Sequence, residues 1–142
     1  MSQWTHVSGL IRIDAIPSVD GTTITKVENR FGKTCTYDDD SATWDACTVP
    51  SGSEGSLQYE VKVTGEDSLR WGIVSVWGDL RDYEDYTAIY EWVKKSCKPF
   101  MIRSCMIKID VEYKGTYIIT DTFNRNTLVT NIKITEIPDD ED

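Results

Sequence analysis

Acid–base chemistry in this chain would have to involve His6, the single histidine among its 142 residues. A catalytic histidine needs a carboxylate that orients its ring and a nucleophile within hydrogen-bonding distance. Asp14 is the next acidic residue along the chain, but eight positions of a strand span about 26 Å at roughly 3.3 Å per residue. Ser8 shares the predicted strand face with His6, and no third residue is spaced to orient the ring. We therefore expect His6 to be an exposed strand residue and the chain to have no catalytic residues.

Two aspartates could instead belong to a hydrolytic metal site, which requires several oxygen ligands that converge on one ion. Asp14 ends the first predicted strand and Asp79 lies near the end of the third, so the two strand ends could lie on the same side of a sheet. Asp79 is equally typical of a turn. A metal-dependent nuclease or nucleotide hydrolase is therefore our second alternative, whereas the leading hypothesis includes no metal and no cofactor.

The four cysteines do not have the spacing of a metal or redox site. They are Cys35, Cys47, Cys97 and Cys105, and none of them forms a Cys-x-x-Cys motif. We expect free thiols; a disulfide between the first two is the alternative for an oxidising compartment.

A further group of residues could hold a nucleotide. A glycine-rich turn could cradle a phosphate through its backbone N–H groups, although it lacks the lysine that follows a P-loop. A tryptophan could stack on a base, and two arginines could pair with phosphates. The residues concerned are Trp4, Arg12, Gly52, Ser53, Gly55 and Arg81. Our first alternative is therefore a sponge that sequesters a nucleotide signalling molecule.

Acidic residues outnumber basic ones by 24 to 15, which gives a net charge of −9. This charge opposes direct nucleic-acid binding, because phosphate contacts require clustered lysine and arginine. It favours a protein partner with a basic surface, toward which an acidic patch is steered. The residues that we expect to bind this partner are Asp38, Asp39, Asp40, Trp44, Asp45, Asp79, Asp82, Glu84 and Asp85.

The periodicity of apolar residues predicts strands and helices that position these groups. In chain order the predicted elements are a strand 4–16, a short helix 22–31, an exposed loop insertion 33–56, strands 57–63 and 69–80, a helix 82–97, and strands 101–113, 116–122 and 128–137. Without the loop insertion, the first six elements (strand, short helix, strand, strand, helix, strand) match the ferredoxin-like split βαβ arrangement. We predict one α+β domain over residues 1–138, with one main helix, a C-terminal β-hairpin extension and a disordered acidic tail at 139–142.

Four finer expectations concern the main helix and the core. Asp82 is the predicted helix N-cap, and Trp92 is predicted to lie beside the buried stripe of that helix rather than within it. Trp71 and Trp77 share a strand face and are predicted to pack in the core. The buried positions of the helix and the following strand are predicted to be Tyr86, Ile89, Tyr90, Val93, Cys97, Cys105, Ile107, Ile109, Val111 and Tyr113.

Three sequence stretches resemble small proteins encoded by tailed bacteriophages. They read WTHVSGLIRID at 4–14, PSGSEGSLQY at 50–59 and WGDLRDY at 77–83. The resemblance implies an inhibitor of a bacterial defence system, of the anti-CRISPR or the nucleotide-sponge type. Our leading hypothesis is a non-catalytic phage protein that inhibits a host defence protein by binding it through an acidic surface that contains aromatic residues.

The expected location is the host cytoplasm, without a membrane partner. No window approaches the roughly 18 consecutive apolar residues of a membrane span, and residues 1–6 lack the basic segment and apolar run of a secretory signal. The sequence leaves open whether the chain forms a homo-oligomer.

Overall fold

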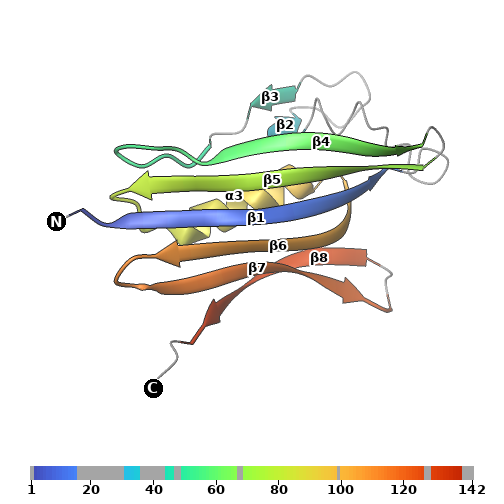
Figure 1. Cartoon of the computed structure of the whole chain (residues 1–142). Helices are drawn as coiled ribbons and strands as arrows, with labels where there is room; N and C mark the ends of the chain where they lie inside the picture. The colour runs from blue at the N-terminus through green and yellow to red at the C-terminus, as the bar shows by residue number, and fades with distance from the viewer. Residues whose placement is uncertain are drawn as a thin grey trace.

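The computed structural model describes residues 2–15, 31–35, 44–46, 49–66, 69–98, 100–126 and 129–138. Its elements are β1 (Trp4–Ala15), β2 (Lys33–Cys35), β3 (Trp44–Ala46), β4 (Gln58–Glu66), β5 (Leu69–Arg81), α3 (Tyr86–Cys97), β6 (Met101–Val111), β7 (Gly115–Asn124) and β8 (Val129–Ile137). One large sheet carries α3 across one of its faces (Figure 1). The predicted α+β class is therefore confirmed.

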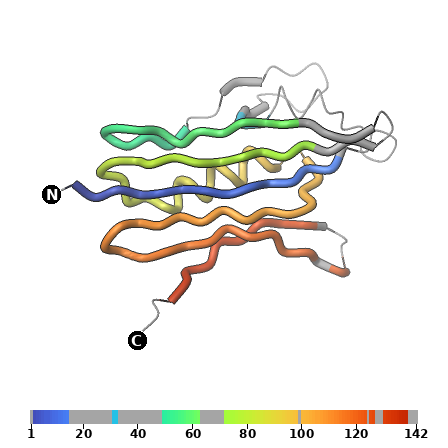
Figure 2. Tube along the Cα trace, in the orientation of Figure 1, coloured from blue at the N-terminus to red at the C-terminus, as the bar shows by residue number. Residues whose placement is uncertain are grey.

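The six long strands form a sheet in the order β4-β5-β1-β6-β7-β8, and every neighbouring pair is antiparallel. The apolar run at 69–80 predicts a central strand, and β5 indeed lies between β4 and β1. Trp4 pairs with Arg81 and Ala15 with Arg70, so the start of β1 lies beside the end of β5. The chain trace in Figure 2 brings the turn between β6 and β7 to this same end of the sheet.

Alternation along the strands separates a covered face from an open face. In β1, Val7, Ile11 and Ile13 are buried on the helix side, whereas Leu10 points to the other side and is exposed. β6 keeps the same division despite a change of register between Arg12 and Ile13 of β1. The bulge explains why the buried positions of β6 begin at residue 102 and resume at residue 105 instead of alternating strictly.

The helix begins four residues later than predicted. Asp85 is the N-cap, since its side-chain oxygen accepts a hydrogen bond from the backbone N–H of Ala88 at 3.1 Å. Asp82 was expected in this role, but it lies in a turn with φ of 54° and its N–H donates to the carbonyl of Gln3. This turn redirects the chain after β5, so the helix can start only beyond it.

Trp92 is a core residue, contrary to the prediction. Only 4% of it is exposed, and its ring packs edge-on against Phe31 and in a tilted arrangement against Tyr59. The buried face of α3 is wider than the narrow stripe inferred from the sequence, and Tyr86 and Tyr90 lie half-buried at its edge. The predicted burial of Ile89, Val93 and Cys97 is confirmed.

The prediction that β6 continues to Tyr113 is wrong. The strand ends at Val111, and Tyr113 is 78% exposed in the following turn, with φ of 68°. Within this turn the N–H of Lys114 donates to the carbonyl of Val111 at 3.0 Å. Cys97 and Cys105 are free and buried, and burial raises the pKa of the Cys105 thiol to about 12.

Several predicted features lie outside the described residues. These are residues 22–30 of the short helix, Asp38, Asp39 and Asp40, Cys47, and the acidic tail 139–142. The predicted insertion at 33–56 contains regular structure, because β2 and β3 pair as a small antiparallel sheet. Its last part folds into a turn in which Ser51 bridges to Ser56.

Candidate partner-binding surface

His6 lies between two carboxylates at the end of the sheet where β1 begins. Its Nδ1 is 2.6 Å from Oδ1 of Asp79 in β5, and its Nε2 is 3.1 Å from Oε2 of Glu112 in the turn after β6. These three residues, the His6 cluster, join three segments that are separated by 73 and 106 positions in the sequence. The interpretation that nothing orients the imidazole is therefore wrong.

The two hydrogen bonds determine the charge state of the cluster. They raise the pKa of His6, because Asp79 and Glu112 both favour the protonated ring. The hydrogen bond from His6 and one from the backbone N–H of Trp4 lower the pKa of Glu112. Both ring nitrogens are occupied, which disfavours the neutral imidazole that a general base requires. The arrangement is suited to cross-linking β1, β5 and the turn after β6.

The glycine-rich turn at residues 51–56 lies at the same end of the molecule, where backbone hydrogen bonds fix it to the end of β5. The N–H of Gly52 donates to the carbonyl of Gly55, and the N–H of Ser53 donates to the carbonyl of Arg81, both at 2.9 Å. The Arg81 guanidinium bonds to Glu54 at 2.6 Å and to the hydroxyl of Ser2 at 2.9 Å. Two of the N–H groups expected to cradle a phosphate are thus used within the protein, as is the guanidinium of Arg81.

Gly55 shows why this turn needs glycine. It has φ of 75°, and a Cβ added there would lie 2.0 Å from the carbonyl oxygen of Asp79. The backbone of the turn therefore approaches the end of β5 more closely than any side chain would allow.

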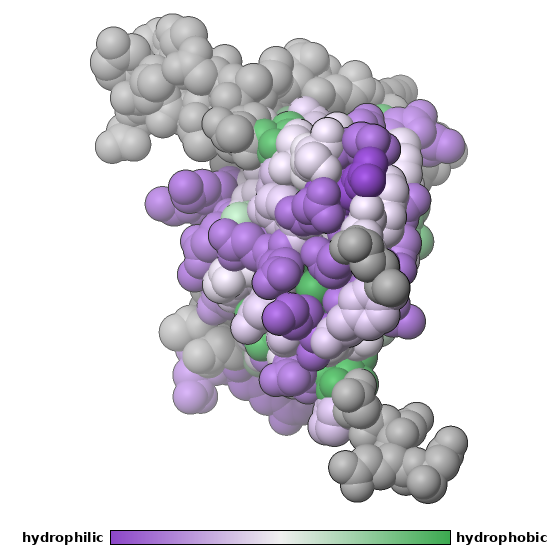
Figure 3. Space-filling model, turned by 90° about the vertical axis from the view of Figure 1, so that its left-hand side faces the viewer, coloured by the Kyte–Doolittle hydropathy of each residue, from purple (hydrophilic) through white to green (hydrophobic). Residues whose placement is uncertain are grey.

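Four of the predicted partner-binding residues, Asp79, Asp82, Glu84 and Asp85, follow one another at the end of β5 and the start of α3. The structure adds Glu54 and Glu112, which were not predicted, and all six carboxylates together are called the acidic end. The side chains of Asp79 and Glu54 are 68% and 63% exposed. Figure 3 looks onto this end of the molecule, where hydrophilic residues predominate around small apolar areas. These two carboxylates are accessible to solvent, although each also pairs within the protein, Asp79 with His6 and Glu54 with Arg81.

Trp44 and Asp45 belong to β3, and their side chains are not among those described. They are therefore not placed relative to the acidic end. Glu112 was missed because the predicted strand 101–113 included it, whereas β6 ends at Val111 and leaves Glu112 in the turn before Lys114 and Gly115. Glu54 gives no such signal, since its position depends on how the turn folds back onto β5.

Asp14 lies at the opposite end of β1 from the acidic end. It pairs with Trp71, whereas Asp79 pairs with His6, so the two aspartates are separated by the length of the antiparallel pair. The expectation that they converge on a metal is therefore wrong. Asp14 instead forms ion pairs with Arg12 at 3.9 Å and Arg103 at 3.7 Å. Among the described residues, no group of three or more histidine, cysteine, aspartate or glutamate side chains is arranged to hold a metal ion.

Five of the six expected nucleotide-binding residues, Trp4, Gly52, Ser53, Gly55 and Arg81, lie at the acidic end, but Arg12 does not. Trp4 pairs with Arg81 at the acidic end, whereas Arg12 lies eight positions further along β1 and pairs with Ile73. Eight strand positions correspond to about 26 Å. A single ligand of nucleotide size cannot contact both Trp4 and Arg12.

Large apolar side chains that neighbour one another are exposed on the open face of the sheet. Leu10 is 56%, Met106 61% and Trp77 43% exposed. Leu10 and Met106 are cross-strand partners in β1 and β6, and Trp77 in β5 is diagonal to Leu10 because it pairs with Ser8. We call these three residues the apolar patch. The prediction that Trp77 packs in the core is wrong, because only the alternate positions of β5 face α3.

No helix within the described ranges has both the length and the apolar character needed to cross a membrane. Comparison of the chain with protein-family models, with curated proteins and with solved structures found no match.

Proposed function

We propose that the chain is a non-catalytic binding protein that docks a basic protein partner on the open face of its sheet. The observation that carries this proposal is the apolar patch, since Leu10, Trp77 and Met106 neighbour one another on adjacent strands and are about half exposed or more. Contiguous exposed apolar residues with a polar rim are typical of protein-binding sites. Trp and Met are also enriched at such interfaces.

The acidic end defines the charge of the partner. Asp79 is exposed on the same open face as Trp77, two positions along β5, so an apolar contact and a negative contact lie side by side. Together with the net charge of −9, this favours steered association with a basic surface. Apolar contacts would then supply affinity, and the carboxylates would supply orientation and association rate.

The partner that we propose is a bacterial defence protein, and the activity is its inhibition in the host cytoplasm. This part rests on the resemblance of residues 4–14, 50–59 and 77–83 to bacteriophage proteins. A basic nucleic-acid channel in a defence nuclease would match the charge of the acidic end. The non-catalytic role is supported by the occupied ring nitrogens of His6 and the separation of Asp14 from Asp79.

We also propose that β1, β4, β5, α3 and β6 form a ferredoxin-like split βαβ unit. Support comes from their antiparallel strand order, β4-β5-β1-β6, in which the first strand of the chain lies between the third and fourth strands of the unit. β7 and β8 then extend the β6 edge. The open face is the side of such a sheet that carries no helix, which leaves it free for a partner.

Phage plating on bacteria that each express one defence system tests this function. A host that expresses the chain should restore plating on at least one system, and Leu10→Lys should abolish the restoration by placing a cation at the centre of the docking surface. Phe123→Lys is the matched control, because Phe123 is 55% exposed but lies outside the apolar patch. Failure to restore plating on any system, or equal activity of both variants, would contradict the proposal.

A further inference from the structure

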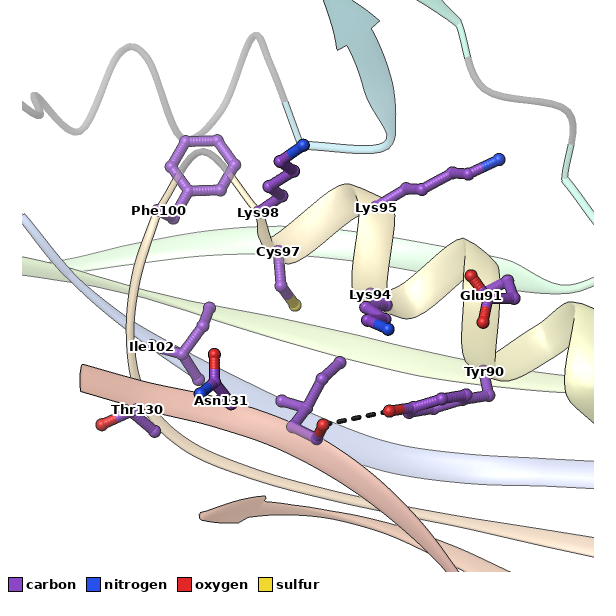
Figure 4. A pocket seen from close by; sticks show the side chains of 11 residues that line it. Tyr90, Glu91, Lys94, Lys95, Cys97, Lys98, Phe100, Ile102, Thr130 and Asn131 are labelled. Atoms are coloured by element: carbon purple, nitrogen blue, oxygen red, sulfur yellow. Dashed lines mark hydrogen bonds between the residues drawn. The ribbon is translucent and has the colours of Figure 1, made fainter. Parts of the chain in front are cut away.

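A cleft of about 670 Å³ lies on the helix side of the sheet, away from the open face. Its walls are the C-terminal half of α3, the start of β6 and the start of β8 (Figure 4). Cys97, Ile102 and Ile132 provide apolar surface, and the ring of Phe100 closes one side. This volume and this mainly apolar lining are typical of small-molecule sites.

Positive charge gathers at this cleft in an otherwise acidic protein. Lys94, Lys95 and Lys98 all line it, and Glu91 is the one carboxylate among the described lining residues. Lys94 is held near Tyr90, with its Nζ 5.6 Å from the ring centroid. All three lysines are exposed, so their side chains can reorient toward an anion.

The helix dipole accounts for only part of this arrangement. Lys94 and Lys95 lie in the last turn of α3, where cations interact favourably with the free carbonyl groups. The dipole gives no reason for an open cleft beneath them, or for the polar Thr130 and Asn131 on the facing wall.

A hydrogen bond joins two walls of the cleft. The hydroxyl of Tyr90 donates a hydrogen bond to the carbonyl of Ile132 at 3.0 Å, which ties α3 to β8. Figure 4 shows Cys97 and Asn131 facing the space between these two elements, with Phe100 at the far side from Tyr90. The α3–β8 frame of the cleft is therefore formed before a ligand binds, whereas the exposed lysine side chains would become ordered on binding.

We propose that this cleft binds a nucleotide. The phosphates would pair with the lysine ammonium groups, and the base would lie on the apolar floor beside Phe100, with Asn131 hydrogen-bonding to its polar edge. More than one cation favours a di- or triphosphate over a single carboxylate. The site is distinct from the nucleotide residues expected from the sequence, and it does not depend on partner docking at the open face.

Titration of the full chain with ATP, followed by backbone amide NMR, tests this proposal. Shifts are expected at residues 94–98 and 130–132 and not at the apolar patch. Pyrophosphate and adenosine should each bind at least tenfold more weakly than ATP, because each supplies only half of the contacts. Absence of shifts with millimolar ATP, shifts located elsewhere, or binding of pyrophosphate as tightly as ATP would overturn the proposal.

Two double variants test whether ATP binding requires the positive charge of the cleft or only the overall charge of the protein. Lys94→Glu with Lys98→Glu should weaken ATP binding at least tenfold. Lys108→Glu with Lys133→Glu changes the net charge equally at two exposed residues on the open face, and should leave binding within twofold. Equal losses in the two double variants would mean that only overall charge matters, and would refute the cleft as the site.

A further variant tests contact with the base. Asn131→Ala, at an exposed position, is expected to weaken the binding of ATP but not the binding of pyrophosphate.

Discussion

The two faces of the sheet differ most clearly in β1, where neighbouring residues have opposite environments. Ile11 is fully buried between the sheet and α3, whereas Leu10 is 56% exposed on the open face. Both are branched apolar residues of nearly equal size. A large apolar side chain therefore stabilises the fold on the covered face, whereas on the open face it is available to a partner.

Their neighbours follow the same division. Val74 of β5 and Cys105 of β6 flank Ile11 and are buried, whereas Ser75 and the exposed Met106 flank Leu10. Burial of the apolar side chains on the covered face stabilises the protein when the chain folds. The apolar area of Leu10 and Met106 can contribute only when something else covers it. The open face is therefore where a substitution can alter binding without unfolding the protein.

The largest expected difference follows directly from this comparison. Ile11→Ala should lower the free energy of unfolding by about 2–5 kcal/mol, because it leaves a cavity in a packed core. Leu10→Ala, at the adjacent position, should change it by no more than about 0.5 kcal/mol. Urea denaturation monitored by circular dichroism measures both values. Similar losses for the two variants would show that the open face is covered in solution, for example by a second copy of the chain.

Local patterns predicted most of the strands but not which face is covered. The alternation in β1 and β4, and the apolar run of β5, arise from residues that are close in sequence. The run of β5, however, places large side chains on both faces, with Val74 and Val76 on one and Ile73 and Trp77 on the other. Nothing local distinguishes them, so Trp77 was assigned to the core although it belongs to the open face.

The His6 cluster could not be predicted for a different reason. Its geometry depends on the register of β1 against β5 and against the turn after β6, and hydrophobic pattern alone does not specify such pairings over 73 and 106 positions. The acidic residues around the start of α3 were found because four of them fall within residues 79–85. The N-cap was misplaced because Asp82 and Asp85 both have the right chemistry, and only the turn geometry selects between them.

A second pair of substitutions compares two neighbouring carboxylates of the acidic end, of which only Asp85 caps α3. Asp85→Ala should lower the free energy of unfolding by about 1 kcal/mol, because it removes the hydrogen bond to the N–H of Ala88. Glu84→Ala removes the adjacent exposed carboxylate, which lies 3.9 Å from the ammonium group of Lys114, and should have a smaller effect. Thermal denaturation of the two variants in the same buffer measures the difference. A larger loss for Glu84→Ala would mean that Asp85 is not the cap.

The smallest expected effect is the pH dependence of the His6 cluster on the open face. The folded state raises the pKa of His6 above its ordinary value of 6.5, so the protonated ring stabilises the fold fully below that pH. This stabilisation is lost as the pH rises through the folded-state pKa. The folded state lowers the pKa of Glu112 below 4.5, so its contribution is present above that pH and is lost in acid. The cluster should therefore stabilise most between about pH 4.5 and 6.5.

His6→Gln isolates this contribution, because glutamine can donate a hydrogen bond but carries no charge. The difference in free energy of unfolding between the wild type and His6→Gln should be largest near pH 6 and should decrease by pH 9. Because His6 is 43% exposed and Asp79 68% exposed, added salt should reduce the difference further. A difference that increases with pH would mean that the neutral ring is the form bound between the two carboxylates. In that case His6 could act as a base, and the non-catalytic assignment of the open face would have to be abandoned.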